Sequence, residues 1–174
     1  EFNKRAGTLN VPLIIGMAKA FQILDEELKD KKQEKLAALV ARIEKEISQK
    51  IPYIIINGKE AQRLSNTTNI SFDCIEGESI LFQLDKLGFC ISSGSACTSG
   101  SLEPSHVLRA MQVPITSAHS SLRISLGRFT KEEEVEAFID TLPTIISRLR
   151  EISPFWDKKN NKPNDKAIQY SCQS

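Results

Sequence analysis

The chain has 174 residues, of which 40% are hydrophobic and 26% charged, the balance of an ordinary soluble globular protein. Its formal net charge of +1 gives no indication of a surface that binds nucleic acid or an acidic membrane. No apolar run is long enough to span a bilayer, and the N-terminus has no signal-peptide core. Four cysteines without C-x-x-C spacing argue against a zinc site and a disulfide scaffold, and favour a reducing compartment such as the cytoplasm.

The N-terminal third of the chain has a helical pattern. Residues 12–49 carry apolar side chains at helical spacing, which predicts one very long helix or two helices joined near residue 30. Pro12 suits the first turn of such a helix. The charged run over residues 25–35 is then expected to be its solvated face.

The remainder alternates strands with helices. Four strands are expected, at residues 53–57, 68–74, 88–92 and 122–126. Helices are expected between and after them, at residues 76–87, 104–111 and 131–152. This order predicts an α/β fold with a short sheet and helices mainly on one face, preceded by the long helical arm.

The last predicted helix has its own start signal and a local defect. Thr130 as N-cap and Glu133 as the third helical residue form a capping-box pattern. Pro143 within the helix predicts a kink or a lost hydrogen bond. The polar tail from Trp156 onward lacks periodicity, so it is expected to be loosely ordered.

Cys97 lies among small residues in "ISSGSACTSGSLEPSHVL", residues 91–108. A thiol is a good nucleophile as the thiolate, and its pKa falls beside a cation or a helix N-terminus. Glycine and serine give such a segment many backbone states, which suits a thiol that collects a group at one place and delivers it at another. A plain surface loop is the alternative, and a structural or incidental role is expected for Cys74, Cys90 and Cys172.

Three basic side chains are further candidates. His106 on the predicted helix and His119 before the last strand could relay protons or be merely solvated. Arg123 alternates with Leu122 and Ile124, so it lies on the other face of its strand. A guanidinium fixed on a strand can bind a carboxylate through two hydrogen bonds, but an ordinary structural salt bridge is equally open.

Several segments together resemble the NifS/IscS-type cysteine desulfurases of the class V aminotransferase family. They are "RAGTLNVP" (5–12), "NTTNISF" (66–72), "EGESILFQLD" (76–85), "SSGSACTSGSLEPSHVLRAM" (92–111), "AHSSLRISLGRFTKEEE" (118–134) and "RLREISPFWD" (148–157). These matches are ordered and cover nearly the whole chain, which is far more specific than one short motif. The cysteine segment is most similar to the NifS branch, which serves iron–sulfur assembly for nitrogen fixation.

The resemblance implies a homodimeric enzyme of fold type I that uses pyridoxal 5'-phosphate (PLP). Such enzymes convert L-cysteine to L-alanine and leave the sulfur as a persulfide on a loop cysteine, from which it passes to an iron–sulfur scaffold or another acceptor protein. Cys97 matches that nucleophile, and its persulfide is a candidate for iron–sulfur contact. Arg123 matches the arginine that binds the substrate carboxylate. Thr8 matches the threonine that contacts the PLP phosphate across the dimer interface.

One expected part of the family is missing. The lysine that anchors PLP lies in an S-x-H-K-like motif, which this sequence lacks. The resemblance therefore implies the C-terminal portion of such an enzyme, inactive alone. Its expected parts are an entry and helical arm (1–50), a small α/β domain (51–155) with the cysteine loop at 93–103, and a polar tail (156–174). The alternatives are a non-enzymatic persulfide carrier or interaction domain, which would not need Arg123 or Thr8, and a selenocysteine lyase.

Overall fold

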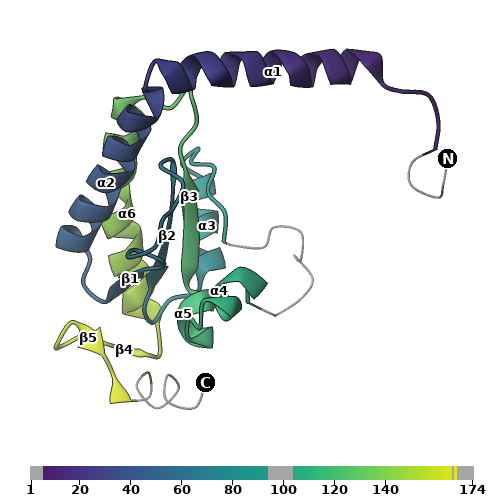
Figure 1. Cartoon of the computed structure of the whole chain (residues 1–174). Coiled ribbons are helices and arrows are strands. Elements are labelled where there is room, and N and C mark those ends of the chain that lie inside the picture. Colours follow the sequence, from purple (N-terminus) through teal and green to yellow (C-terminus); the bar gives the residue numbers. More distant parts are fainter. Residues whose placement is uncertain (1–5, 94–103, 166, 168–174) are drawn as a thin grey trace. The chain divides into compact units, whose positions relative to one another are not determined.

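A computed structural model of the chain describes residues 6–93, 104–165 and 167 (Figure 1). The chain forms two compact units, Glu1–Lys35 and Leu36–Ser174. None of the helices in the described ranges carries an apolar stretch long enough to cross a bilayer.

The first unit contains α1 (Val11–Lys29) and the start of α2 (Lys32–Lys50). Asn10 caps α1, because its side chain accepts a hydrogen bond from the N–H of Leu13 at 3.3 Å. Lys31 at the junction has φ 56°, a left-handed conformation that ends a helix. Of the two arrangements expected for residues 12–49, the structure has the two helices joined near residue 30.

An antiparallel sheet of three strands lies at the centre of the second unit. Its order is β1 (Ile54–Ile56), β2 (Thr67–Phe72) and β3 (Ser121–Ser125) (Figure 1). The register of β2 and β3 places Ile70 opposite Leu122 and Thr68 opposite Ile124. Directly opposite residues share a face, so these buried side chains make one continuous surface of the sheet.

Three helices cover that surface: α2 from Leu36 onward, α3 (Gly77–Asp85) and α6 (Glu132–Ile152). Their apolar stripes and the sheet form a single core, and the predicted arrangement with helices mainly on one face is confirmed. The largest fully buried apolar side chains of this core are Ile43, Ile47, Ile70, Phe72, Ile80, Leu84, Leu122, Ile124, Ile139, Leu142 and Ile146.

Two short helices precede β3: α4 (His106–Ala110) and α5 (Ile115–His119). The sequence predicted the first of these and not the second. β3 then begins against the N-terminus of α3. A Cβ atom on Gly77 would lie 2.8 Å from the carbonyl oxygen of Ser121 and 3.0 Å from that of His119. Glycine is the residue that permits this approach of helix and strand.

The strand predicted at residues 88–92 is wrong. Only Ser92 pairs with the sheet, through an isolated bridge to Arg123. Gly88 has φ 85°, and Phe89 and Ile91 pack against the core. The chain therefore meets the edge of β3 at one residue instead of running beside it.

The capping prediction for α6 is wrong by one residue. The hydroxyl of Thr130 accepts a hydrogen bond from the N–H of Gly127 at 2.9 Å, so it belongs to the preceding turn. Lys131 is the N-cap, and its N–H donates to the side chain of Glu134 at 2.8 Å. The helix continues through Pro143 to its end.

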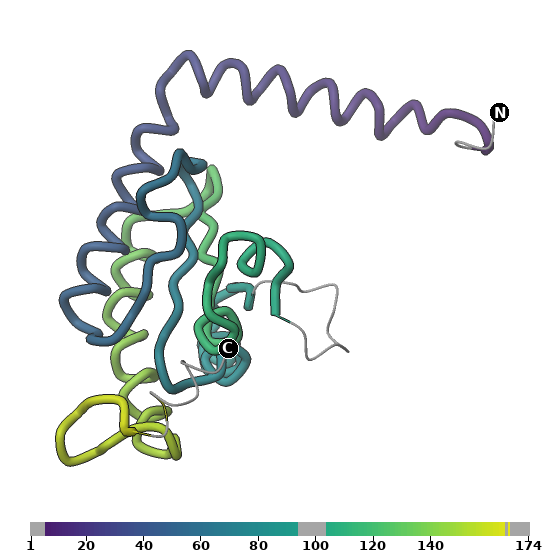
Figure 2. The backbone as a smooth tube through the Cα atoms, turned by 60° about the horizontal axis from the view of Figure 1, so that its bottom comes forward, coloured from purple at the N-terminus to yellow at the C-terminus, as the bar shows by residue number. Residues whose placement is uncertain are grey.

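The part of the tail that the structure describes, from residue 156 to residue 165, is more ordered than predicted. A short hairpin forms from β4 (Trp156–Asp157) and β5 (Lys162–Pro163), and Figure 2 shows it in yellow at the C-terminal end of α6. The Trp156 ring is 7% exposed, lies 4.2 Å from the guanidinium carbon of Arg150 and meets Tyr53 edge-on at 5.6 Å. The pattern missed this anchor because the partners of Trp156 lie elsewhere in the sequence.

An ion pair ties α2 to the connection between β1 and β2. Arg63 donates to both carboxylate oxygens of Glu44, at 2.7 and 3.3 Å. Burial alone raises the pKa of Glu44, but hydrogen bonds from Arg63 and Thr68, together with the charge of Arg63, outweigh it. The pKa of Glu44 therefore lies below its usual value.

We expect Glu44→Gln to lower the free energy of unfolding by about 1 kcal/mol at neutral pH. Because the folded-state pKa is depressed, this contribution is present above the unfolded pKa of about 4.3 and is lost as the pH falls through the folded value. Urea unfolding at neutral and acidic pH measures the difference. Exposed Glu60→Gln is the control, and a penalty for Glu44→Gln that persists at low pH would contradict the prediction.

Candidate functional site

Arg123 projects from the polar face of the sheet. Its neighbours Leu122 and Ile124 are buried in the core, whereas Arg123 itself is exposed. Its guanidinium forms no hydrogen bond or ion pair with any residue that the structure describes. The structural salt bridge considered from the sequence thus finds no partner within these ranges.

Polar side chains lie beside Arg123 on the same face. Asn69 is its direct cross-strand neighbour in β2. The side-chain amide of Asn57 donates to Asn69 Oδ1 at 2.6 Å and to Ser71 Oγ at 2.8 Å. These contacts fix the amide of Asn69 next to the arginine. Sequence reasoning missed this row, although Asn69 and Ser71 alternate with the core residues Ile70 and Phe72.

The backbone of Arg123 is bound to Ser92. The N–H of Arg123 donates to the carbonyl of Ser92 at 2.6 Å, and the N–H of Ser92 donates to the carbonyl of Arg123 at 3.3 Å. Ser92 Oγ is buried and has no hydrogen-bond partner within the described part of the chain. Cys97 follows five residues later in the sequence. The peptide that leads to Cys97 is therefore attached to the strand that carries Arg123.

The other predicted site residues are placed separately. Cys97 lies outside the described residues. Thr8 is exposed in the first unit, between Gly7, with φ 89°, and the helix cap Asn10. His106 begins α4 and His119 ends α5, and both are exposed. Among the residues given by the structure, no three of histidine, cysteine, aspartate or glutamate gather as metal ligands would.

Cys74 has the features of a structural thiol. It has φ 70°, lies two residues after the end of β2 and is partly buried. Burial raises its pKa to about 11, the neighbouring Asp73 carboxylate adds to the rise, and the charge of Arg150 opposes it. The thiol therefore stays protonated at neutral pH, which agrees with the structural or incidental role expected for it. Cys90 is exposed, and Cys172 lies outside the described residues.

Comparison with known proteins places the chain in a family. The model of the aminotransferase class-V family matches residues 2–138. Cysteine desulfurase 2 of Trichormus variabilis is 54% identical over 155 residues, which are 89% of this chain and 38% of that protein. Cysteine desulfurase NifS of Azotobacter vinelandii is 46% identical over 160 residues, 90% of this chain and 39% of the relative.

A solved structure agrees with these sequence relatives. The X-ray structure of a NifS-like protein from Rickettsia africae matches with a TM-score of 0.70 and 32% identity, covering 81% of this chain and 36% of that one. The chain thus spans less than half the length of the relatives that it matches. The resemblance to NifS/IscS-type cysteine desulfurases is confirmed, and the chain belongs to the aminotransferase class-V family.

Proposed function

We propose that the chain is the C-terminal part of a PLP-dependent cysteine desulfurase. The proposed reaction breaks the C–S bond of L-cysteine and forms an S–S bond on Cys97, so that L-cysteine and the Cys97 thiol give L-alanine and a Cys97 persulfide. The observation that carries this proposal is the exposed guanidinium of Arg123, which has no ion pair in the described ranges and sits on a strand joined to Ser92. Relatives named cysteine desulfurase support it.

In this proposal Arg123 holds the α-carboxylate of L-cysteine through two parallel hydrogen bonds. Asn69 lies opposite it on β2 and keeps that face polar. Cys97 supplies the thiolate that attacks the substrate sulfur. The bridge at Ser92 keeps the root of the cysteine segment beside the strand that orients the substrate.

In this proposal Thr8 would lie at the edge of the cofactor site. Thr8 has an exposed hydroxyl that suits an oxygen of the PLP phosphate. When bound, PLP supplies the electron sink that the carbon–sulfur chemistry needs. The sequence has no lysine in an S-x-H-K pattern, so the lysine that anchors PLP would come from residues outside this sequence.

We expect the chain alone to show neither PLP absorbance nor desulfurase activity, and a yellow, active preparation would contradict this.

The domain arrangement, the dimer and the sulfur acceptor are proposed from the resemblance to the cysteine desulfurases. We propose that the arm at residues 1–50 joins the small domain (51–155) to the PLP-binding part, and that Thr8 reaches the cofactor of the other subunit in a homodimer. An iron–sulfur scaffold or another acceptor protein would take the sulfur, in the cytoplasm. We also propose iron–sulfur contact through a Cys97 persulfide.

A chimera tests the assignment of Arg123. This chain replaces the matching segment of Trichormus variabilis cysteine desulfurase 2, to which it is 54% identical. We expect Arg123→Ala to raise the KM for L-cysteine about tenfold to a hundredfold, since hydrogen bonds between charged groups are lost. Arg123→Lys keeps the charge without the two-point geometry and should recover part of the loss.

The exposed Arg128, which lies 5.7 Å from the Phe129 ring, provides the matched control. Arg128→Ala should leave KM unchanged. A carrier that only receives sulfur would accept it equally well with and without Arg123. An active chimera in which Arg123→Ala leaves KM at its original value would therefore overturn the carboxylate role.

A further inference from the structure

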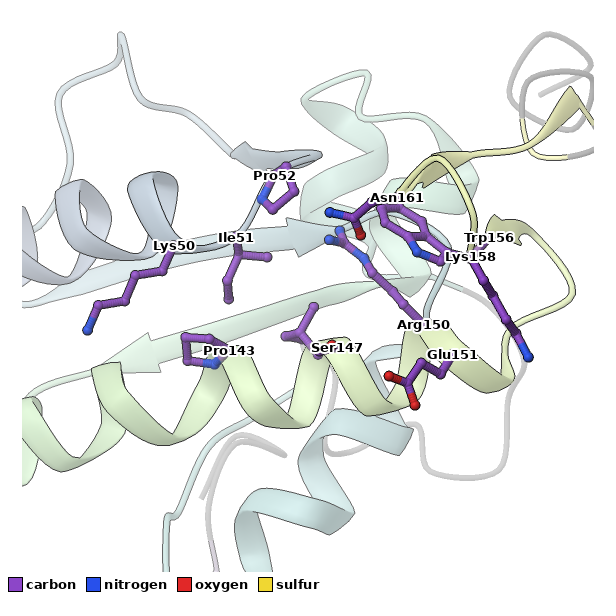
Figure 3. Close-up of a pocket in the computed structure, with 11 residues that line it drawn as sticks. Lys50, Ile51, Pro52, Pro143, Ser147, Arg150, Glu151, Trp156, Lys158 and Asn161 are labelled. Carbon is purple, nitrogen blue, oxygen red and sulfur yellow. The ribbon is translucent and has the colours of Figure 1, made fainter.

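A cavity of about 430 Å³ lies where the end of α2, the C-terminal half of α6 and the β4–β5 hairpin meet (Figure 3). Its volume falls in the range of small-molecule sites. None of the residues that line it belongs to β3 or to the segments that carry Thr8 and Cys97. The cavity is therefore separate from the residues of the proposed desulfurase site.

Arg150 is a buried cation in the wall of this cavity. It is 4% exposed, and it donates from Nη2 to the carbonyl of Tyr53 at 3.0 Å and from Nε to that of Asp73 at 3.4 Å. Its Nη1 makes no hydrogen bond with any residue in the described ranges. In Figure 3 the guanidinium extends away from α6 toward the side of the cavity lined by Pro52 and Asn161. A guanidinium nitrogen in the cavity wall can donate a hydrogen bond to an acceptor in the cavity.

The cavity wall has more basic than acidic side chains. Lys50, Arg150 and Lys158 line it together with one carboxylate, Glu151. Lys50 is already paired with Asp140 at 2.7 Å, whereas Lys158 forms no ion pair within the part of the chain that the structure describes. The cavity therefore offers the positive charges of Arg150 and Lys158 to an incoming anion.

The wall also has apolar parts, beside the polar side chains of Ser147 and Asn161. Pro52, Pro143, Ile51 and the Trp156 ring contribute hydrocarbon and aromatic surface next to the cations. An inorganic ion would leave this surface in contact with water, and a neutral apolar molecule would leave the cations without an acceptor. We propose that the cavity binds a small organic anion, with a phosphate or carboxylate group at Arg150 and Lys158 and an apolar body against the prolines and Trp156.

Trp156 is the single tryptophan of the chain, so its fluorescence reports directly on this cavity. The purified 174-residue chain is titrated at constant ionic strength with phenyl phosphate and, separately, with benzoate. Inorganic phosphate is the probe for the anionic group alone, and benzyl alcohol is the probe for the apolar body alone. We expect a saturable change with at least one aromatic anion, and binding about tenfold weaker or worse for both partial probes. The tighter of the two anions identifies the head group.

Lys158→Gln should weaken binding of the preferred anion about fivefold, since one charged contact at a half-open site is lost. Lys159→Gln is the matched control, because Lys159 is the next residue and does not line the cavity. Both substitutions lie on exposed side chains, which keeps the fold intact. The proposal is overturned if neither aromatic anion gives a saturable change, if benzyl alcohol binds as well as the anions, or if Lys158→Gln binds like the original chain.

Discussion

Replacing Cys97 by serine in the chimera is expected to abolish sulfur transfer, with alanine formation falling by about a thousandfold or more. A thiolate forms near neutral pH and attacks sulfur readily, whereas the serine hydroxyl stays protonated and is a poor nucleophile. Mass spectrometry supplies a second readout, because the peptide that contains Cys97 should gain one sulfur atom in the unsubstituted chimera after a turnover with L-cysteine, and lose this gain in Cys97→Ser.

Cys90→Ser is the control for this experiment, since Cys90 is an exposed cysteine seven residues earlier in the sequence. That variant should keep both alanine formation and the persulfide. Full activity of Cys97→Ser, or a persulfide found on Cys90 instead, would refute the assignment of the nucleophile. The carrier alternative also requires Cys97, so this experiment identifies the sulfur acceptor and the Arg123 experiment separates enzyme from carrier.

Arg150→Leu is expected to lower the free energy of unfolding by about 3 kcal/mol. Arg150 joins three parts of the second unit: it holds the carbonyls of Tyr53 and Asp73 and covers the ring of Trp156. Leucine fills similar space but leaves two partly buried carbonyl oxygens without that donor and removes the cation–π contact. Burial lowers the pKa of Arg150, while the nearby Cys74, Asp73 and Tyr53 oppose that shift.

Urea unfolding of the whole chain, followed by circular dichroism, measures this loss. Arg148→Leu is the matched control, because Arg148 is an exposed arginine two residues earlier on the same helix. It should change the unfolding free energy by less than about 0.5 kcal/mol. Equal effects of the two substitutions would show that the carbonyl contacts of Arg150 contribute nothing to stability.

The elements with strong periodicity could be predicted from the sequence. The stripe from Leu36 to Ile47 and the stripe along α6 each have one buried face, and the structure packs both on the sheet. The alternation in β3 also predicted which face Arg123 occupies. These features depend on side chains within one element, so local patterns suffice to find them.

The features that were missed depend on contacts between distant segments. Arg150 reaches Tyr53 across 97 positions of the sequence, and no local pattern around Trp156 signals that contact. The single bridge at Ser92 replaces the predicted strand because only one residue meets the edge of β3. Asn57 finds Asn69 through the pairing of β1 with β2, which was not readable from the sequence.

Gly77 has a consequence for the position of Arg123. The carbonyl oxygens of His119 and Ser121 lie 3.0 and 2.8 Å from where a Cβ of residue 77 would be, so the absence of a side chain lets the start of β3 lie close to α3. Arg123 is two residues farther along that strand, and Ser92 is hydrogen-bonded to it. A methyl group at position 77 would therefore press on the start of β3 and shift Arg123 together with Ser92, whose backbone is hydrogen-bonded to that of Arg123.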